Sequence, residues 1–223
     1  FDKMIFSRDY HEHDHCGFRN DEDPEKHKGI HPPHCVQKSM GAAFDERIKS
    51  LLRDLLNDRS YADKTEIVFK AMEMEAFGAS IATHKEGKWY NTHSVENGGR
   101  HGHCCKDKCD SLGDECLNLT GGFKIGEARS KLENIHDSIE TKDLEQKYDI
   151  KDVLDELKKK KFKKHNIYIT GLAGCHCVSE TATNIADYFE SEIFRRTYPN
   201  FDYQIYIIED LTRYAFVPLI VGP

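Results

Sequence analysis

The sequence predicts an α/β fold, in which a parallel β-sheet carries helices on both of its faces. Short runs of β-branched or aromatic residues have the near-continuous apolar character of strands buried on both faces of a parallel sheet. Segments with apolar residues at helical spacing separate these runs, and this alternation is typical of βαβ units. The expected strands are residues 3–6, 66–69, 166–170 and 204–208.

Helical periodicity fills the intervals between the expected strands. Apolar residues recur at helical spacing over residues 44–56, 153–157 and 178–189. Residues 84–148 break the alternation, because they are charged, contain glycine and show little apolar periodicity. A segment so poor in apolar residues could not bury a core of its own. We therefore expect a single α/β domain over residues 1–223, with a polar insertion at 84–148.

Charge and hydropathy exclude several classes of partner. The 32 Lys and Arg residues against 39 Asp and Glu residues give a net charge of -7, which argues against nucleic-acid binding. No apolar run approaches the roughly 20 residues of a membrane span. The first residues, FDKMIFSRDYH, lack the charged-then-apolar layout of a secretory signal. We expect a cytoplasmic protein whose eight cysteines are mainly reduced thiols.

Metal-binding residue types follow the first expected strand. Asp9, His11 and His15 come directly after it, and His34 follows a Pro-Pro pair. In open parallel sheets, sites form beyond the carboxyl ends of the strands. Imidazole and carboxylate groups suit Zn²⁺, Fe²⁺ or Mn²⁺. The pattern suits one divalent metal, zinc in the first instance with iron or manganese as alternatives. Taken alone, however, the motif is more typical of a polar histidine-rich loop.

The third expected strand leads into the sequence GLAGCHCV, where a thiol meets the start of a helix. The exposed N–H groups and the dipole of a helix N-terminus lower a thiol pKa and stabilise an oxyanion. Cys175 and Cys177 both fit the role of nucleophile, and a pair of buried structural thiols is the alternative. Lys70 ends the second strand, where a lysine usually points into water, so its role depends on its neighbours.

Five segments in one order resemble a known family. They are IFSRDYHEHDH, PPHCVQKSMGAAF, IVFKAM, IYITGLAGCHCVSETATNIA and IYIIEDLTR. Together they resemble the nicotinamidases of the isochorismatase-like cysteine hydrolase family, across the whole chain apart from the insertion. The resemblance implies the isochorismatase-like hydrolase fold. It also implies an amidase that hydrolyses nicotinamide to nicotinic acid and ammonia in NAD salvage, and a homo-oligomer.

The resemblance also implies roles for individual residues. Cys177 matches the nucleophile and Lys70 the lysine that helps to hold it as a thiolate. Asp9, His11 and His34 match the ligands of a metal that binds the pyridine nitrogen of the substrate. His15 matches a further histidine that joins the metal shell in some members.

Further positions match the substrate pocket of the family. The peptide Leu172–Ala173 matches a cis bond, and the N–H groups of Ala173 and Cys177 match the oxyanion hole. Ala173 also matches a position that contacts substrate. His31 stands where many relatives carry an aromatic residue that lines the substrate ring.

Two features depart from the family pattern. Relatives carry a proton-accepting aspartate on an additional strand, which comes before the strand that corresponds to residues 3–6 here. We expect a preceding segment to supply it, because the loss of a central parallel strand would expose a long unpaired edge; a truncated or inactive form is the alternative.

The insertion holds residues that could bind a second, structural zinc, but its CCxxxC-x6-C spacing is irregular and favours a flexible loop. These residues are His93, His101, His103, Cys104, Cys105, Cys109 and Cys116.

Two other functions compete with nicotinamide hydrolysis. One is a related cysteine amidohydrolase that acts on another small amide. The other is a non-catalytic zinc-binding protein built on a decayed hydrolase domain. Metal content at Asp9, His11 and His34 distinguishes the first from a nicotinamidase, and the reactivity of Cys177 distinguishes the second.

Overall fold

Parallel and antiparallel strand pairs, with flanking helices, form the described part of the chain. The computed structural model describes residues 1–15, 18–19, 31–71, 153, 156–157, 159 and 164–214, together with the backbone of residues 122–125 and 144–148. These residues form a mixed α/β structure.

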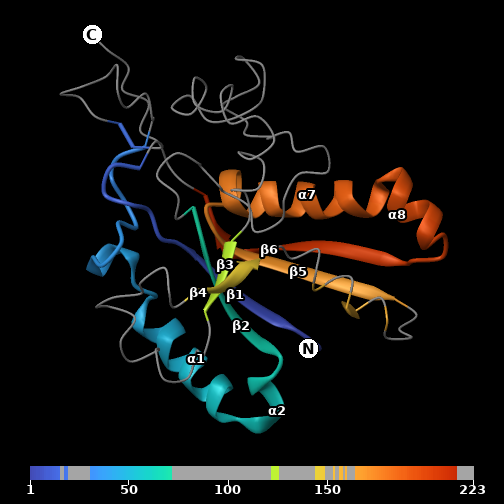
Figure 1. Ribbon diagram of the computed structural model, residues 1–223, viewed down its shortest axis with the longest axis horizontal. Coiled ribbons are helices and arrows are strands. Elements are labelled where there is room, and N and C mark those ends of the chain that lie inside the picture. The colour runs from blue at the N-terminus through green and yellow to red at the C-terminus, as the bar shows by residue number, and fades with distance from the viewer. Residues whose placement is uncertain are drawn as a thin grey trace.

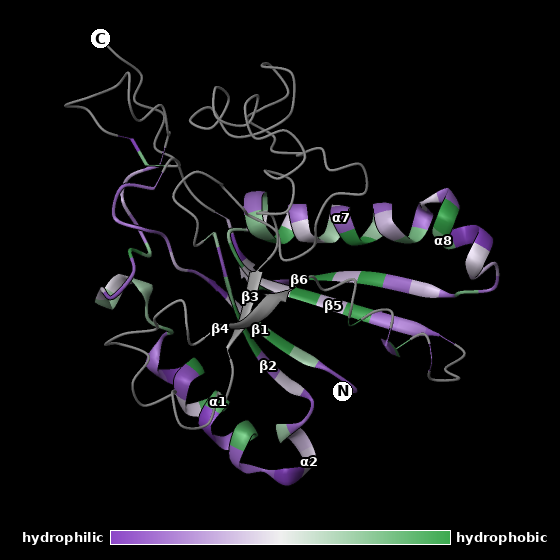
Figure 2. Ribbon diagram, in the orientation of Figure 1, coloured by the Kyte–Doolittle hydropathy of each residue, from purple (hydrophilic) through white to green (hydrophobic). Residues whose placement is uncertain are grey.

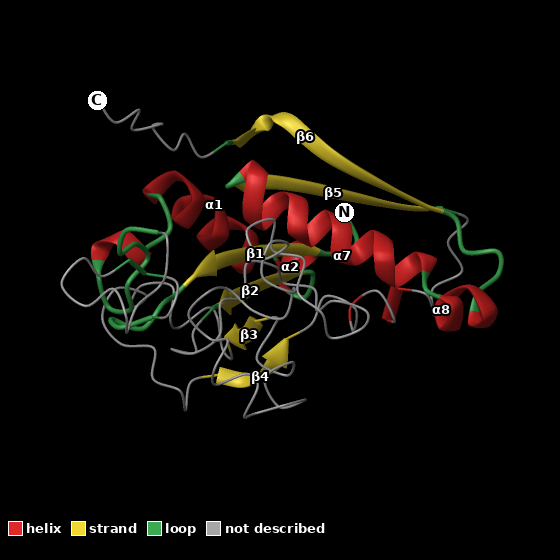
Figure 3. Cartoon of the chain, turned by 90° about the horizontal axis from the view of Figure 1, so that it is seen from above, coloured by secondary structure: helices red, strands yellow, loops and turns green. Residues whose placement is uncertain are grey.

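Six strands form two hydrogen-bonded sheets. They are β1 (Met4–Asp9), β2 (Thr65–Lys70), β3 (Gly122–Ile125), β4 (Leu144–Tyr148), β5 (His165–Leu172) and β6 (Tyr203–Arg213). One sheet has the order β1-β2-β3-β4, with β1 and β2 parallel and the other pairs antiparallel; β5 and β6 form a parallel pair. Figure 3 shows all six strands following one another across the molecule in the order β6, β5, β1, β2, β3, β4. The parallel strands thus include the four that the sequence predicts.

Strands β3 and β4 were not predicted. Both lie within residues 84–148, and they extend the sheet from the edge of β2 in antiparallel fashion. Their sequences, GFKI and LEQKY, are short and carry charged or polar residues, so they lack the apolar run that marks a buried strand. The histidines and cysteines predicted as an alternative zinc site in this insertion lie outside the described residues.

The helices flank the strands on opposite sides. A short helical turn η1 (Met40–Ala42), α1 (Glu46–Asn57) and α2 (Arg59–Ala62) precede β2, whereas η4 (Gly174–Val178), α7 (Ser179–Glu190) and α8 (Glu192–Thr197) link β5 to β6. In Figure 1, α7 and α8 lie on one side of the strands and α1 and α2 on the other. The helices predicted over 44–56 and 178–189 are confirmed. In the described part of the chain, no helix has both the length and the hydrophobicity to cross a bilayer.

Two hydrophobic clusters account for this layering. One joins Leu52 and Leu56 of α1 to Tyr10 and Phe69, and the other joins Ile185 and Phe189 of α7 to neighbouring strand residues. Successive side chains of a strand point to opposite faces of the sheet. Accordingly Phe6 of β1 packs with the first cluster and Ile5 with the second. Every residue of β2 is buried between the two layers.

Strand β5 differs from the prediction of burial on both faces. Its side chains alternate between half-buried and exposed along the whole strand. Tyr168, on the exposed face, is 50% accessible and stacks on Tyr206 of β6 with ring centroids 5.0 Å apart. Figure 2 shows the matching alternation of hydrophobic and hydrophilic bands along β5 and β6. The prediction is wrong for β5 because a run of β-branched and aromatic residues also suits a half-buried strand.

Phe189 is central to the second cluster, and its removal should destabilise the fold. Its side chain is fully buried, with ring centroids 4.4 Å from Tyr203 and 5.0 Å from Phe201. We expect Phe189→Ala to lower the free energy of unfolding by about 3–5 kcal/mol, measured by urea denaturation. The exposed Thr183 on the same helix provides the control, since Thr183→Ala should change it by no more than about 0.5 kcal/mol. Equal effects of the two variants would contradict this assignment of the core.

Candidate active site and metal centre

Three strand ends bring the candidate site residues to one edge of the molecule. Strands β1 and β2 run parallel in a register that sets Asp9 opposite Lys70 at their carboxyl ends. Strand β5 ends at Leu172 and passes through Ala173 into η4, which carries Cys177. The sequence predicted that these residues would gather at the carboxyl ends of the parallel strands, and the structure places them there.

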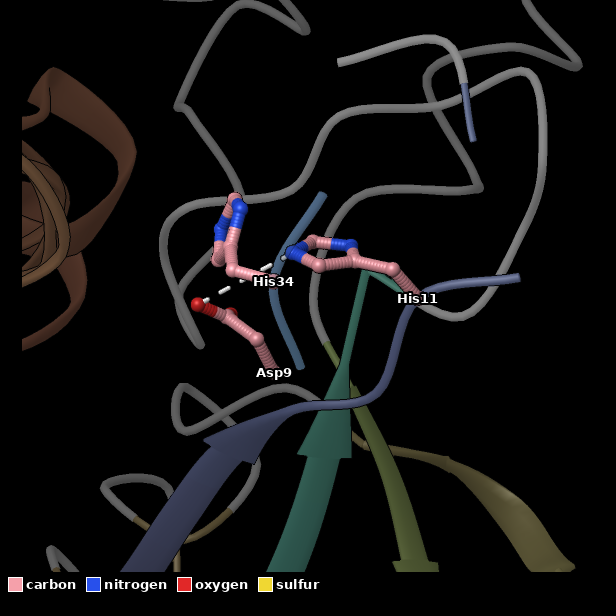
Figure 4. Close-up of side chains that lie close together, drawn as sticks. All are labelled: Asp9, His11 and His34. Carbon is pink, nitrogen blue, oxygen red and sulfur yellow. Dashed lines mark ion pairs between the residues drawn. The ribbon is translucent and has the colours of Figure 1, made fainter. Parts of the chain in front are cut away.

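Asp9, His11 and His34 form a group that could hold a metal ion. One ligand atom from each lies within 4.8 Å of the others, and Figure 4 shows the three side chains pointing toward one another. Asp9 ends β1, His11 follows two residues later and His34 comes from a separate loop. A backbone hydrogen bond joins the two segments: the His11 N–H donates to the Cys35 carbonyl oxygen at 2.9 Å.

Backbone carbonyls orient both imidazole rings. Nδ1 of His11 lies 3.0 Å from the carbonyl oxygen of Ala71, and Nδ1 of His34 lies 2.8 Å from that of Pro32. A carbonyl oxygen can only accept a hydrogen bond, so each Nδ1 carries the proton. A neutral ring in this tautomer presents the Nε2 lone pair as its ligand atom. Nε2 of His11 lies 4.0 Å from Oδ2 of Asp9.

The charges of these groups suit a divalent cation. Burial lowers the pKa of His11 to about 3, so its ring is neutral at neutral pH. Burial alone would raise the pKa of Asp9, but Lys70 and His11 outweigh it and lower that pKa, so the carboxylate is ionised. Two imidazoles and one carboxylate are a donor set that fits Zn²⁺, Fe²⁺ or Mn²⁺.

His15 lies beside this group without being one of its three members. It is fully buried, and its ring centroid is 4.3 Å from that of His11. The ring of Phe18 packs against His11 and His34, with its centroid 5.4 Å from that of each imidazole. These contacts hold the His11 ring in place, and the participation of His15 in metal binding stays a prediction.

Lys70 connects the metal group to a cysteine. Its ammonium forms an ion pair with Oδ1 of Asp9 and donates a hydrogen bond to Sγ of Cys177 at 3.3 Å. Only 4% of Lys70 is exposed, so it does not point into water as a strand-end lysine usually does. Cys177, rather than Cys175, therefore faces the lysine. Both cysteines and Cys35 are free thiols.

Cys177 is a half-buried thiol beside a fixed cation. Burial raises the pKa of the Cys177 thiol, while Lys70 and a hydrogen bond from the Ala173 backbone act in the opposite direction. Burial would lower the pKa of Lys70, but Asp9 and Cys177 outweigh burial and raise this pKa above its ordinary value. The ammonium therefore keeps its proton. An ammonium held against Sγ stabilises the thiolate whenever the thiol loses its proton.

The backbone around Cys177 has features that the resemblance implies. The peptide Leu172–Ala173 is cis. The Ala173 N–H faces Sγ of Cys177, where it is one of the two donors predicted for an oxyanion hole. A Cβ on Gly174 would lie 2.9 Å from Cγ2 of Thr212 and 2.9 Å from Cε1 of Tyr214, so only glycine allows this close approach to β6.

His31 lies near the turn that carries Cys177, and its family counterpart lines the substrate ring, which stays a prediction for this chain. Its ring stands edge-to-face with that of His176, with centroids 5.6 Å apart. His31 also lies 5.8 Å from His34, so it connects the metal group with the turn that carries Cys177. Sequence reasoning missed His176, although its position directly before Cys177 was a usable signal.

Sequence reasoning also missed Glu180. This carboxyl is buried in the first turn of α7, although charged residues are rarely buried. Its position three residues after Cys177 would have placed the two on one face of a helix.

Comparisons with known proteins leave the site geometry as the basis for assigning a function. No family model, curated protein or solved structure matches the chain.

Proposed function

We propose that the protein is a metal-dependent cysteine amidohydrolase with an isochorismatase-like fold that converts nicotinamide to nicotinic acid and ammonia. The observation that carries the proposal is the position of Lys70 between two groups. It binds one oxygen of Asp9 and the sulfur of Cys177, while the other oxygen of Asp9 faces His11. The ion pair of Lys70 with Asp9 therefore connects the proposed nucleophile, Cys177, to the proposed metal-binding group.

The chemistry follows from the residues around Cys177. Its thiolate, held by the Lys70 ammonium, attacks the carboxamide carbon, and the backbone N–H groups of Ala173 and Cys177 receive the developing oxyanion. The C–N bond then breaks, and the amide nitrogen leaves as ammonia with the proton lost by the thiol. Water attacks the resulting thioester, which releases nicotinic acid and restores the thiol.

Asp9, His11 and His34 provide the selectivity for a pyridine. These three residues would hold a divalent metal, which would act as a Lewis acid toward the ring nitrogen. His31 lies between this group and the turn that carries Cys177, and His176 belongs to that turn. Both rings provide flat surfaces for an aromatic ring.

Hydroxylamine provides a test for the thioester. The intact, zinc-loaded protein should convert nicotinamide to nicotinohydroxamic acid when hydroxylamine competes with water, while ammonia release continues. This outcome requires an acyl group on the protein, because hydroxylamine then attacks the thioester carbon and frees the thiol. Ammonia release that yields nicotinic acid alone, whatever the hydroxylamine concentration, would contradict a covalent mechanism and favour direct attack by water.

A further inference from the structure

Three non-glycine residues in the described part of the chain have a left-handed backbone, and each contacts Tyr10 or His11. They are Cys35, Lys38 and Ala71, with φ angles of 47°, 64° and 52°. The Cys35 carbonyl accepts a hydrogen bond from the His11 N–H, and the Lys38 N–H donates one to the Tyr10 hydroxyl. The Ala71 carbonyl oxygen lies 3.0 Å from Nδ1 of His11. Such conformations are unfavourable for residues with a Cβ and cluster at functional sites.

The conformation of Ala71 decides where its carbonyl points. Successive carbonyls of an extended strand point to opposite edges of that strand. The Lys70 carbonyl points toward β1, because it accepts a hydrogen bond from the Tyr10 N–H at 3.1 Å. An extended Ala71 would therefore direct its carbonyl toward β3, which pairs with the other edge of β2. The left-handed Ala71, directly after β2, turns this carbonyl back to His11.

The hydrogen bond to Ala71 determines which atom His11 offers to a metal. Both residues are buried, so water competes little with the carbonyl for the imidazole. A proton kept on Nδ1 leaves the Nε2 lone pair as the ligand, on the side of the ring that faces Asp9. Mutation of groups that hold a ligand imidazole in this way lowers metal affinity roughly 10- to 100-fold.

We propose that Ala71 is a positioning residue for the metal centre, because its left-handed conformation aims the carbonyl that fixes the tautomer and orientation of His11. The inference rests on the metal group of the proposed function. It predicts that zinc affinity follows the tolerance of residue 71 for a left-handed backbone, and not the size of its side chain. Glycine and asparagine adopt this backbone readily, whereas β-branched valine does not.

The test measures the zinc affinity of the intact protein by competition with a chromophoric chelator. Ala71→Gly and Ala71→Asn should bind zinc within about threefold of the parent, and Ala71→Val should bind it roughly 10- to 100-fold more weakly. Lys38→Val is the matched control, because it places the same side chain on a left-handed backbone that donates its hydrogen bond to Tyr10. This control should bind zinc as the parent does.

A second measurement reports the tautomer of His11 and needs no metal. Long-range proton–nitrogen NMR spectra of the zinc-free protein should show a protonated Nδ1 in the parent and in Ala71→Gly, and mixed tautomers in Ala71→Val. His11→Gln assigns the signals by their loss. If Ala71→Val does not fold, Ala71→Gly still decides. It should raise the midpoint of urea denaturation, because glycine adopts a positive φ without strain. A methyl group needed only for packing would make the midpoint fall, which would overturn the proposal.

The affinities contain further outcomes that would overturn the proposal. Equal zinc affinity in Ala71→Val and the parent would show that the backbone of residue 71 does not influence the metal centre. A loss in Ala71→Asn as large as that in Ala71→Val would assign the effect to side-chain size. An equal loss in Lys38→Val would assign it to general destabilisation. A parent that binds no zinc would refute the proposed metal centre, while the NMR spectra would still decide whether Ala71 fixes the tautomer of His11.

Discussion

Cys177→Ala should abolish ammonia release from nicotinamide, with kcat at least about a thousandfold lower. Cys177 is the thiol that Lys70 contacts, at 3.3 Å, and no neighbouring hydroxyl or thiol shares that position in the described part of the chain. The measurement is a coupled ammonia assay, with metal content determined on each protein to show that the metal group is intact.

Cys175→Ala provides a matched control for this prediction. Cys175 lies in the same turn, is partly buried like Cys177 and is also a free thiol. The alanine variant should keep kcat within a few-fold of the parent. Activity that survives the loss of Cys177 but not of Cys175 would reverse the assignment of the nucleophile.

Removing the imidazole of His11 or His34 should lower the zinc affinity by at least about a hundredfold. Each alanine variant loses one of three ligand atoms that lie within 4.8 Å of one another. Competition with a chromophoric chelator measures the affinity.

His13→Ala is the control for the metal site. His13 comes from the same segment as His11, but its side chain is 89% exposed. We expect this variant to bind zinc as the parent does. If His13→Ala and His11→Ala weakened binding equally, zinc would bind to surface histidines and the proposed metal centre would be wrong.

The parts of the fold that sequence predicted are those with strong periodicity. Helix α7 follows from the apolar spacing between Val178 and Phe189, and β2 from a short run that is buried on both faces. Strands β3 and β4 gave no comparable signal, because GFKI and LEQKY carry polar or charged residues in short segments. Strand β3 forms by pairing with the edge of β2, and β4 by pairing with β3. Such tertiary pairing does not require a local pattern.

The candidate site could be predicted as a group but not in its details. Sites form beyond the carboxyl ends of parallel strands, so Asp9 and Lys70 were both expected at the site. Their direct pairing is seen only in the structure. The choice between Cys175 and Cys177 required the position of the lysine ammonium. Glu180 escaped prediction because a charged residue in a helix is ordinarily solvated, and only the tertiary structure shows that this one is buried.

The most direct test of the proposed function is ammonia release from nicotinamide by the intact protein, with and without added zinc. We predict equal amounts of ammonia and nicotinic acid, about one metal per chain, and loss of turnover when a chelator removes the metal. A protein that binds zinc at Asp9, His11 and His34 but releases no ammonia from nicotinamide would contradict the assignment. The Lys70–Cys177 pair would then serve another amide or no amide at all.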